Sequence, residues 1–523
     1  MADDLSSGAS RFTFYASRFT HYASRMTLLA AFVSTATYLL VAASRIAYPY
    51  DIDFLENSML MQSLRIAHGQ PVYLPPNVEF VPHVYTPLYM WLGGMLFRVT
   101  GPGYVPLRLM SFGATLISAF VIYRAARYES GRGWLAIACA GLYFGGYRII
   151  DGWYELARVD SLFVMLALVA FGTGVYARGM RRLILSALAM ALVFYTKQTG
   201  VVFAVALFLY LLMAVGRRAW LFAAIYLGLT VPFVVVMNST TGGWFDYYIF
   251  GIASSNPIEF ERVVTYVRFE LLGLMISLSV MAMATALLGA RRSGRAILLE
   301  RPWLVGITVA IAVSGLGRAS VGGAMNNLMP AYAFLCIAPA LFFAEWKAWL
   351  PAIEQRWKTS EPVHLSLLVF RLASIPAACI AALILVQFIL GAYNPFRFMP
   401  SAGMRGSGDR LIERIASLDG EVFVMMHPYY ALLAGKQPSA QIAIVWHGRE
   451  RGALPLPADL VSRIQARYYA AILSDETLFE TDPPLLGLIE ANYVRAETLD
   501  ASDAPPTTTG MFSQTRVVYV PRK

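Results

Sequence analysis

The amino-acid sequence predicts a mainly α-helical, polytopic membrane protein with a small α/β domain at its C-terminal end. Hydrophobic residues make up 58% of the 523 residues, charged residues make up 14%, and the mean hydropathy is +0.56. A typical soluble chain contains about 25% charged residues. The apolar content ends near residue 392, and the remainder is mixed enough for a small soluble domain. The net charge of +10 does not by itself indicate a nucleic-acid partner, and we expect none.

About eleven apolar segments are candidates for membrane spans, since a helix needs roughly 20 residues to cross about 30 Å of hydrocarbon. They cover residues 27–47, 105–123, 134–150, 160–177, 183–196, 200–215, 219–237, 271–289, 303–316, 328–345 and 366–391. We interpret the shorter segment 88–98 as interfacial, which keeps the number of spans odd.

Basic residues precede the first span and follow the second, fourth, sixth, eighth and tenth spans, so the positive-inside rule orients the bundle. These residues are Arg11, Arg18, Arg25, Arg124, Arg127, Arg132, Arg178, Arg181, Arg182, Arg217, Arg218, Arg291, Arg292, Arg295, Arg301, Lys347, Arg356 and Lys358. The rule predicts a cytoplasmic N-terminal segment (1–26), a transmembrane domain (27–392) and an extracytoplasmic α/β domain (393–523).

The N-terminal segment contains the repeat RFTFYAS, RFTHYAS, RMTLLAA, which has a period of seven. Arg11, Arg18 and Arg25 then share one face of a helix beside the cytoplasmic membrane surface. Such a basic, aromatic helix can hold anionic lipid headgroups. The alternative is a plain positive anchor that only fixes the orientation. The long apolar run that follows does not read as a cleavable signal peptide.

The first outer loop, residues 48–91, contains three carboxylates within six residues: Asp51, Asp53 and Glu56. The following stretch from Phe54 to Ile66 has the apolar spacing of an amphipathic helix lying on the membrane surface. It ends at the turn GQPVY, and the loop closes on YTPLYMW. Carboxylates at a membrane face are costly unless they are exposed or paired, so they are functional candidates. The alternative is an ordinary solvated loop.

Other polar residues fall in the remaining outer loops, so acidic and basic groups converge on one face. The candidates on the substrate side are His83, Tyr85, Asp151, Glu155, Asp160, Asn326 and Asn327. Asp160 has an alternative role as a helix N-cap. Asp151 and Glu155, spaced like one helical turn, could share a cation or pair with Arg148 or Arg158. A plain glycine-rich turn would also explain Asn326 and Asn327.

Lys197 follows the fifth span in FYTKQTG and is the strongest candidate to bind a phosphate group. A compact ammonium is a good point-charge partner for phosphate, although a lysine at this boundary could also simply reach toward water. Arg262, Arg268 and Arg318 are weaker candidates for the same role.

Several other classes of site find no support in the sequence. It contains no P-loop, no G-x-S-x-G turn and no tight His/Cys spacing for zinc. Cys139, Cys336 and Cys379 all fall within apolar spans and are expected to be core residues. The outer loops therefore have no cysteines for disulfides.

The C-terminal region alternates between helical and strand patterns. DRLIERIASL and LVSRIQARYY are predicted helices, and EVFVMM, AAILSD and VVYVP are predicted strands. His427 and His447 are expected to be structural rather than catalytic.

The order of these parts resembles the C-type (GT-C) glycosyltransferases. The resemblance is to the bacterial branch with protein O-mannosyltransferases, aminoarabinose transferases of lipid A and related lipopolysaccharide glycosyltransferases. The motifs that carry it are DIDFLE, GQPVY, YTPLYMW, ARVDSLF and FYTKQTG, in this order. The family's adjacent Asp-Glu pair is replaced here by the spaced Asp51, Asp53 and Glu56. His83-Val84-Tyr85 stand where the family carries an acidic residue before its prolines.

The resemblance implies a GT-C bundle with juxtamembrane helices. It implies transfer of a sugar from a polyprenyl-phosphate donor to a lipid, glycan or protein hydroxyl of the cell envelope, normally with inversion. The reaction would take place on the outer face of a bacterial cytoplasmic membrane. Asp53 is the first choice for the base, and Glu56 or Asp51 the second. Lys197 and a loop arginine would bind the leaving phosphate. No cofactor is implied with certainty, and a divalent metal ion is left open.

The alternative function is a transporter or flippase for a lipid-linked or anionic solute. A transporter would place its charges near the bilayer midplane and often shows an internal repeat. Here the charges gather on one face, and no repeat relates two halves of the chain. A polymerase or ligase of lipid-linked polysaccharide would depend on arginines of a large outer loop.

Overall fold

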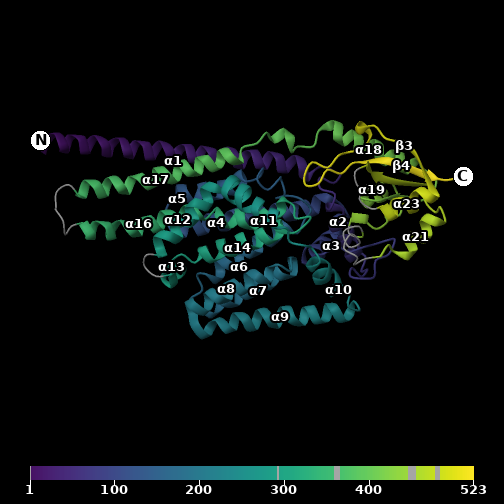
Figure 1. Ribbon diagram of the computed structural model, residues 1–523, viewed down its shortest axis with the longest axis horizontal. Helices are drawn as coiled ribbons and strands as arrows, with labels where there is room; N and C mark the ends of the chain where they lie inside the picture. Colours follow the sequence, from purple (N-terminus) through teal and green to yellow (C-terminus); the bar gives the residue numbers. More distant parts are fainter. Residues whose placement is uncertain (1, 291–293, 358–364, 444, 446–454, 477–482) are drawn as a thin grey trace.

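A computed structural model describes residues 2–290, 294–357, 365–443, 445, 455–476 and 483–523. The molecule is elongated, with long helices running along its longest axis and the C-terminal α/β domain at one end (Figure 1). The N-terminus lies at the opposite end. All segments predicted to be outer loops meet at the end that carries the α/β domain, as the contacts below show.

Each predicted span contains a helix. These helices are α1 (Ala2–Ile46), α4 (Tyr104–Ser130), α5 (Gly133–Gly145), α6 (Asp160–Gly174), α7 (Met180–Thr196), α8 (Gly200–Val215), α9 (Ala219–Thr240), α12 (Ile276–Ala290), α14 (Trp303–Ala319), α15 (Met329–Leu335), α16 (Ala338–Trp357) and α17 (Leu365–Gly391). By length and apolarity, the described part of the chain has five helices able to cross a membrane, or six if a pair bent by 92° is one span. The protein is a multi-pass membrane protein, and the number eleven stays a prediction.

Short helices connect the long ones. They are α3 (Leu88–Thr100), η1 (Gly216–Arg218), α10 (Trp244–Asp246), η2 (Tyr247–Ile252), α11 (Phe260–Thr265), η3 (Tyr266–Leu274), α13 (Gly294–Glu300), η4 (Met325–Leu328), η5 (Pro395–Arg397) and η6 (Ala501–Asp503). At η1 the chain reverses between α8 and α9, and Gly216 adopts a positive φ of 60° there. Glycine is suited to this position because it carries no Cβ.

The predicted helix of the first outer loop is α2 (Glu56–Ala67). Its expected position on a surface is wrong, because every residue from Glu56 to Leu64 is buried. The α/β domain covers the polar side of α2: Ser58 pairs with Gln441, and the Gln441 amide donates to the Phe54 carbonyl at 2.7 Å. The polar face that looked solvated is therefore an internal domain contact.

The C-terminal domain contains a four-stranded sheet in the order β1-β2-β4-β3. β1 (Val422–Val424) and β2 (Ala471–Asp475) are parallel, while β4 (Thr515–Pro521) is antiparallel to β2 and to β3 (Tyr493–Thr498). The helices are α18 (Ala402–Ser417), α19 (Pro428–Leu433), α21 (Ala458–Gln465) and α23 (Pro483–Asn492). The three predicted strands and two predicted helices are present. His447 lies outside the described residues.

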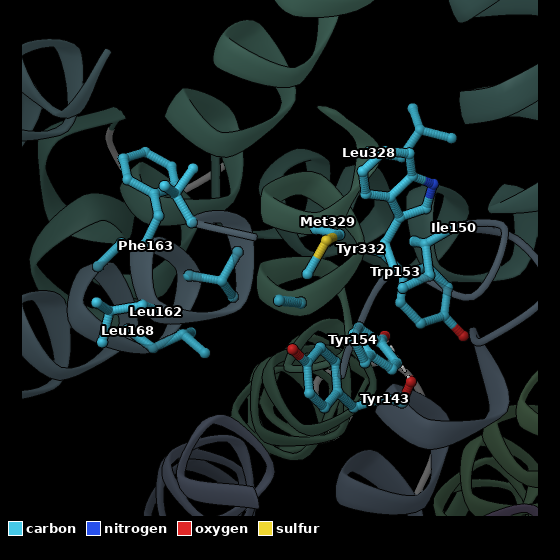
Figure 2. Close-up of a cluster of buried hydrophobic side chains, with 14 of the residues drawn as sticks. Tyr143, Ile150, Trp153, Tyr154, Leu162, Phe163, Leu168, Leu328, Met329 and Tyr332 are labelled. Atoms are coloured by element: carbon cyan, nitrogen blue, oxygen red, sulfur yellow. Dashed lines mark hydrogen bonds between the residues drawn. The ribbon is translucent and has the colours of Figure 1, made fainter. Parts of the chain in front are cut away.

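The connection between α5 and α6 packs in the hydrophobic core of the bundle. Residues 146–159 form turns rather than helix, and Asp151 adopts a positive φ of 53°. Figure 2 shows Ile150, Trp153 and Tyr154 of this connection among Tyr143, Leu328 and Tyr332. A Cβ on Gly146 would lie 1.9 Å from the Tyr332 ring, so backbone and aromatic ring are in direct contact. This packing fixes the polar residues that follow.

Candidate active site

Four segments that are distant in sequence bring their polar residues together at the outer end of the bundle. We define the polar cluster as Asp53, Tyr85, Arg158, Asp160, Lys197 and Asn326. Two ion pairs form it: Arg158 to Asp53 at 2.6 Å and Lys197 to Asp160 at 3.1 Å. The predicted convergence of acidic and basic residues from several outer loops is thus present in the structure.

Asp53 is almost fully buried, and only one of its two carboxylate oxygens is used. Oδ2 accepts a hydrogen bond from Arg158 at 2.6 Å, while Oδ1 has no hydrogen-bond partner among the described residues. Burial raises the pKa of Asp53 to about 7; the Arg158 charge opposes this shift, and Glu56 and Asp51 add to it. A carboxylate with a free oxygen and a pKa near neutrality suits a general base.

Arg158 pairs with Asp53, so its alternative pairing with Asp151 or Glu155 is wrong. Its guanidinium lies over the rings of Trp153 and Tyr85, at 5.0 and 5.8 Å from their centroids. It also donates to the Tyr85 hydroxyl at 3.2 Å. Its position within ARVDSLF, beside Asp160, was the available signal.

Lys197 and Asp160 form the second pair of the cluster. The Asn326 amide donates to the same Asp160 oxygen at 3.1 Å, and the other oxygen has no partner among the described residues. The N-cap alternative is wrong, since Val159 is the N-cap and Asp160 makes no capping bond. Lys197 is 14% exposed and directed at Asp160, so it does not simply reach toward water. Its ammonium also lies 5.6 Å from the Tyr85 ring centroid, so that ring lies near both cations.

Glu56 makes a different kind of pair. Both of its oxygens accept from Arg108, at 2.9 and 2.6 Å, and they also accept from the backbone N–H groups of Ala157 and Ile52. Arg108 donates further to the carbonyls of Arg45, Tyr48 and Tyr50. Burial would raise the pKa of Glu56, but Arg108 and these hydrogen bonds outweigh it and lower the pKa. Glu56 therefore has no free oxygen with which to take a proton.

Asp51 holds the α/β domain against the first outer loop. It contacts His427 Nδ1 at 2.5 Å, the Tyr430 hydroxyl, and Asn57 at 2.8 Å. Burial disfavours the charged form of His427, but Asp51 and Asp475 outweigh it and raise its pKa to about 10. This buried network supports the expected structural role of His427.

Glu155 and Asp151 lie in the turns after α5 and are not a helical pair. Glu155 is 2.9 Å from Arg45 and accepts a hydrogen bond from the Tyr147 hydroxyl at 2.6 Å. Asp151 accepts from the backbone N–H of Gly510 at 3.0 Å. Neither carboxylate has an ion pair with Arg148 or Arg158 among the described residues.

The remaining candidates lie around the polar cluster or apart from it. The His83 ring stacks on Tyr85, with 4.6 Å between centroids. Arg318 is held by Glu270 at 2.5 Å, and Arg262 by Glu259 at 2.8 Å. Two more candidates have other neighbours. Arg268 is exposed and lies over Phe269, and the Asn327 amide donates to the Ala324 carbonyl. Of the predicted phosphate ligands, only Lys197 joins the cluster through a described contact.

No group of three or more His, Cys, Asp or Glu side chains suited to a metal ion occurs in the described residues. His83 and Tyr85, which replace the family's acidic residue, face each other as stacked rings and not as a pair of ligands.

A loop of the C-terminal domain, residues 504–514, covers Asp53. The backbone N–H groups of Thr508 and Thr509 donate to the Ile52 carbonyl at 3.0 and 3.1 Å. At Gly510, where φ is +74°, an added Cβ would lie 2.9 Å from the free Oδ1 of Asp53. The next residues, Met511 and Phe512, are exposed. The covering loop therefore combines a close contact to the carboxylate with an apolar outer tip.

Comparison with solved structures shows which fold this is. The crystal structure of ArnT from Cupriavidus metallidurans bound to undecaprenyl phosphate aligns over 93% of this chain and 97% of that chain. The TM-score is 0.56 and the sequence identity is 13%, and the apo structure of ArnT gives the same values. The chain has the GT-C fold. The apo oligosaccharyltransferase of Archaeoglobus fulgidus also aligns, with a TM-score of 0.49, 13% identity, and coverage of 94% and 74%.

Residues 83–241 of this GT-C chain match the family described as dolichyl-phosphate-mannose-protein mannosyltransferase. The matched stretch contains four members of the polar cluster: Tyr85, Arg158, Asp160 and Lys197. No curated protein sequence gives a match. The predicted GT-C architecture, a helical bundle with a small C-terminal sheet, is confirmed.

Proposed function

We propose that this GT-C protein is a glycosyltransferase that moves a sugar from a polyprenyl-phosphate donor to an acceptor hydroxyl. The observation that carries the proposal is the polar cluster itself. A buried carboxylate with one free oxygen lies beside a lysine and an arginine that converge on one tyrosine ring. Support also comes from the comparisons, because ArnT was crystallised with undecaprenyl phosphate and the matched family is described by a lipid-phosphate sugar.

In the proposed reaction, the acceptor hydroxyl attacks the anomeric carbon of the donor sugar. The Oδ1 atom of Asp53 takes the hydroxyl proton as the new carbon–oxygen bond forms. The bond from the anomeric carbon to the phosphate oxygen breaks, and its electron pair leaves with the polyprenyl phosphate. Attack from the face opposite the leaving group gives inversion. The product phosphate needs no proton, but it needs positive charge around it.

Lys197 and Arg158 supply that positive charge. Each is paired with a carboxylate, Lys197 with Asp160 and Arg158 with Asp53, so the charges of the polar cluster are balanced by internal ion pairs. A donor phosphate would draw Lys197 from Asp160, which still accepts from Asn326. Preorganised cations in a dry site stabilise developing negative charge more strongly than water does. The His83 ring stacks on Tyr85, whose ring lies near both cations.

In this proposal, movement of the covering loop, residues 504–514, admits substrates to Asp53. Asp53, Arg158 and Asp160 are each no more than 3% exposed. The tip of the loop is attached over Asp53 through two backbone hydrogen bonds to Ile52, one from Gly510 to Asp151 and one from Arg45 to the Thr509 hydroxyl. The end of the loop is anchored in the α/β domain through Ser513, which contacts His427 and Asp475. Opening of the tip, residues 508–512, would uncover the site.

The proposal includes an orientation in a bacterial cytoplasmic membrane. The polar cluster and the α/β domain would face outward, and the N-terminus and the arginine-rich loops would face the cytoplasm. Polyprenyl-linked donors suit the outer face, where nucleotide sugars are absent. The sugar would be a hexose or a pentose, and the acceptor a lipid, glycan or protein of the cell envelope.

The test is sugar transfer by the purified full-length protein in detergent, with a panel of polyprenyl-phosphate sugars and a cell-envelope extract. We expect transfer by the native chain and a loss of about 10²–10⁴-fold in Asp53→Asn, with donor binding retained. Asp246→Asn, an exposed carboxylate on the same face, is the matched control and should keep full activity. Equal transfer by the native chain and Asp53→Asn would exclude Asp53 as the base. No transfer with any donor, together with lipid movement across liposomes, would favour the transporter instead.

A further inference from the structure

Two adjoining cavities lie at the end of the bundle that is remote from the polar cluster. The first, of about 960 Å³, lies between the α6–α7 connection, α8 and α13. The second, of about 480 Å³, lies between α4, α6 and α7. In Figure 1, α13 lies toward the N-terminal end of the bundle, far from the α/β domain. Neither cavity takes part in the proposed transfer reaction.

The first cavity is lined by four arginines: Arg178, Arg181, Arg182 and Arg301. Two carboxylates, Glu129 and Glu300, also line it, so it keeps an excess of two positive charges. Arg301 is already engaged, with Glu345 at 3.2 Å and Glu129 at 3.6 Å. Arg178 and Arg181 are exposed and have no ion pair within the part of the chain that the structure describes. These two guanidinium groups are free to bind an anion.

The second cavity is mostly apolar, whereas the first is charged. Its walls include Val121, Val169, Leu185 and Trp303, and Arg124 and Arg182 are the two charged residues that line it. This change from a charged to an apolar lining over adjacent cavities is the pattern expected for an amphipathic ligand.

Three residues, Tyr128, Tyr176 and Arg182, line both cavities and form the wall between them. The wall is well fixed. The Tyr176 hydroxyl donates to Glu129 and accepts from the Trp303 indole, both at 2.8 Å, and the two tyrosine rings are 4.3 Å apart. Arg182 donates to the Tyr176 carbonyl at 3.1 Å. The charged and the apolar linings therefore adjoin at a boundary whose side chains are held in place by hydrogen bonds.

We infer that this pair of cavities binds an anionic phospholipid, with its phosphate at Arg178, Arg181 and Arg182 and one acyl chain in the apolar cavity. Guanidinium groups match the oxygens of phosphate and bind them through paired hydrogen bonds. The orientation proposed above places the arginines at the cytoplasmic leaflet, whose anionic lipids attract basic residues. An inorganic phosphate would leave the apolar cavity empty. The inference rests on the orientation proposed above but not on the transfer reaction, because the cavities lie at the other end of the molecule.

The experiment compares lipid retention by the full-length protein in mild detergent, measured by native mass spectrometry after addition of phosphatidylglycerol or phosphatidylcholine. We expect phosphatidylglycerol to be retained in preference to phosphatidylcholine. The double variant Arg178→Gln/Arg181→Gln should bind it about 30-fold more weakly, since a basic residue near a lipid surface contributes about 1 kcal/mol. If the native protein retains phosphatidylglycerol and phosphatidylcholine equally, that result alone overturns the inference.

A matched control is the double variant Arg217→Gln/Arg218→Gln. These arginines are exposed in the next basic turn but line neither cavity. They should leave lipid retention unchanged, and an equal loss in both double variants would show a general charge effect and overturn the site.

The acyl-chain half of the inference has its own test. Gly172→Leu places a side chain into the apolar cavity, where a Cβ would make ordinary contacts of 3.7 Å with Trp303 and Val121. It should weaken phosphatidylglycerol binding about tenfold but leave binding of soluble glycerol phosphate unchanged. If inorganic phosphate stabilises the native protein as much as the lipid does, the ligand is a free anion and not a lipid.

Discussion

Two buried ion pairs, only three residues apart in the first outer loop, serve opposite purposes. Glu56 pairs with Arg108 and Asp53 pairs with Arg158, and in each case the arginine comes from another segment of the chain. Both carboxylates are almost fully buried. Glu56 uses both oxygens for bonds to Arg108 and to two backbone N–H groups, whereas Oδ1 of Asp53 has no partner in the part of the chain that the structure describes. A saturated buried carboxylate fixes structure, and a half-saturated one remains available for chemistry.

The pKa values of the two carboxylates move in opposite directions for this reason. Hydrogen bonds that stabilise the charged form outweigh burial at Glu56 and lower its pKa. At Asp53 burial dominates and raises the pKa to about 7. Asp53 thus exists as a mixture of charged and neutral forms at neutral pH, while Glu56 stays charged.

The largest effect that separates the two pairs should be on stability. Glu56→Gln leaves Arg108 as a buried charge without a counterion, which typically costs about 3–5 kcal/mol of folding free energy. Asp53→Asn should cost much less at pH 7, because the neutral acid is already well populated there. Denaturant unfolding of both variants in the same detergent measures the difference. Equal destabilisation would mean that the two pairs are equivalent.

The next largest effect should be on the rate of transfer, after substitution of Lys197 in the second ion pair of the polar cluster. Lys197→Met should lower the rate of transfer by about 10²–10³-fold, since removing one preorganised group that stabilises transition-state charge has effects of this size. The loss should appear mainly in kcat if Lys197 acts on the leaving phosphate. Arg268→Met removes an exposed basic residue at the same end of the molecule and serves as the control. Equal rates in the two variants would exclude Lys197 from the site.

Local sequence patterns predicted the elements well. Apolar runs such as 200–215 and 366–391 matched α8 and α17 closely, because membrane helices satisfy their backbone within one segment. The strand β3 was not predicted, since its residues alternate poorly and are exposed beyond Tyr493. The acidic motif after the first span and Lys197 were also found from the sequence, and the structure brings Asp53 and Lys197 into one cluster.

What the sequence could not provide was the pairing between distant segments. Glu56 and Asp53 look alike in DIDFLE, and only the approach of Arg108 or Arg158 distinguishes them. The burial of α2 could not be predicted for the same reason. Its polar face contacts Gln441, which lies nearly 400 residues later in the chain, and no local periodicity contains that information.

A smaller effect should follow from closing the gap above Asp53. Gly510→Ala adds a Cβ 2.9 Å from the free Oδ1 and forces a non-glycine residue to a φ of +74°, which costs about 1–2 kcal/mol. Gly435→Ala is a matched control, because its φ is also +74° but no atom lies within 4 Å of the new Cβ. We expect similar backbone strain in both variants, and a reduced transfer rate in Gly510→Ala alone. A normal rate in Gly510→Ala would show that the covering loop does not limit access to Asp53.

The smallest effect should be in the pH dependence of transfer. The base must be charged to take a proton. With a pKa of about 7, the charged fraction of Asp53 increases with pH and is about fivefold smaller at pH 6 than at pH 7.

The effect of the same titration on folding stability has the opposite sign. A raised carboxyl pKa stabilises the fold at low pH, and this contribution is lost as pH rises through about 7. Glu56 adds no step between pH 6 and pH 7, because its pKa is lowered. The residual activity of Asp53→Asn should then be independent of pH over this range, and a persisting acid limb would assign the titration to another group.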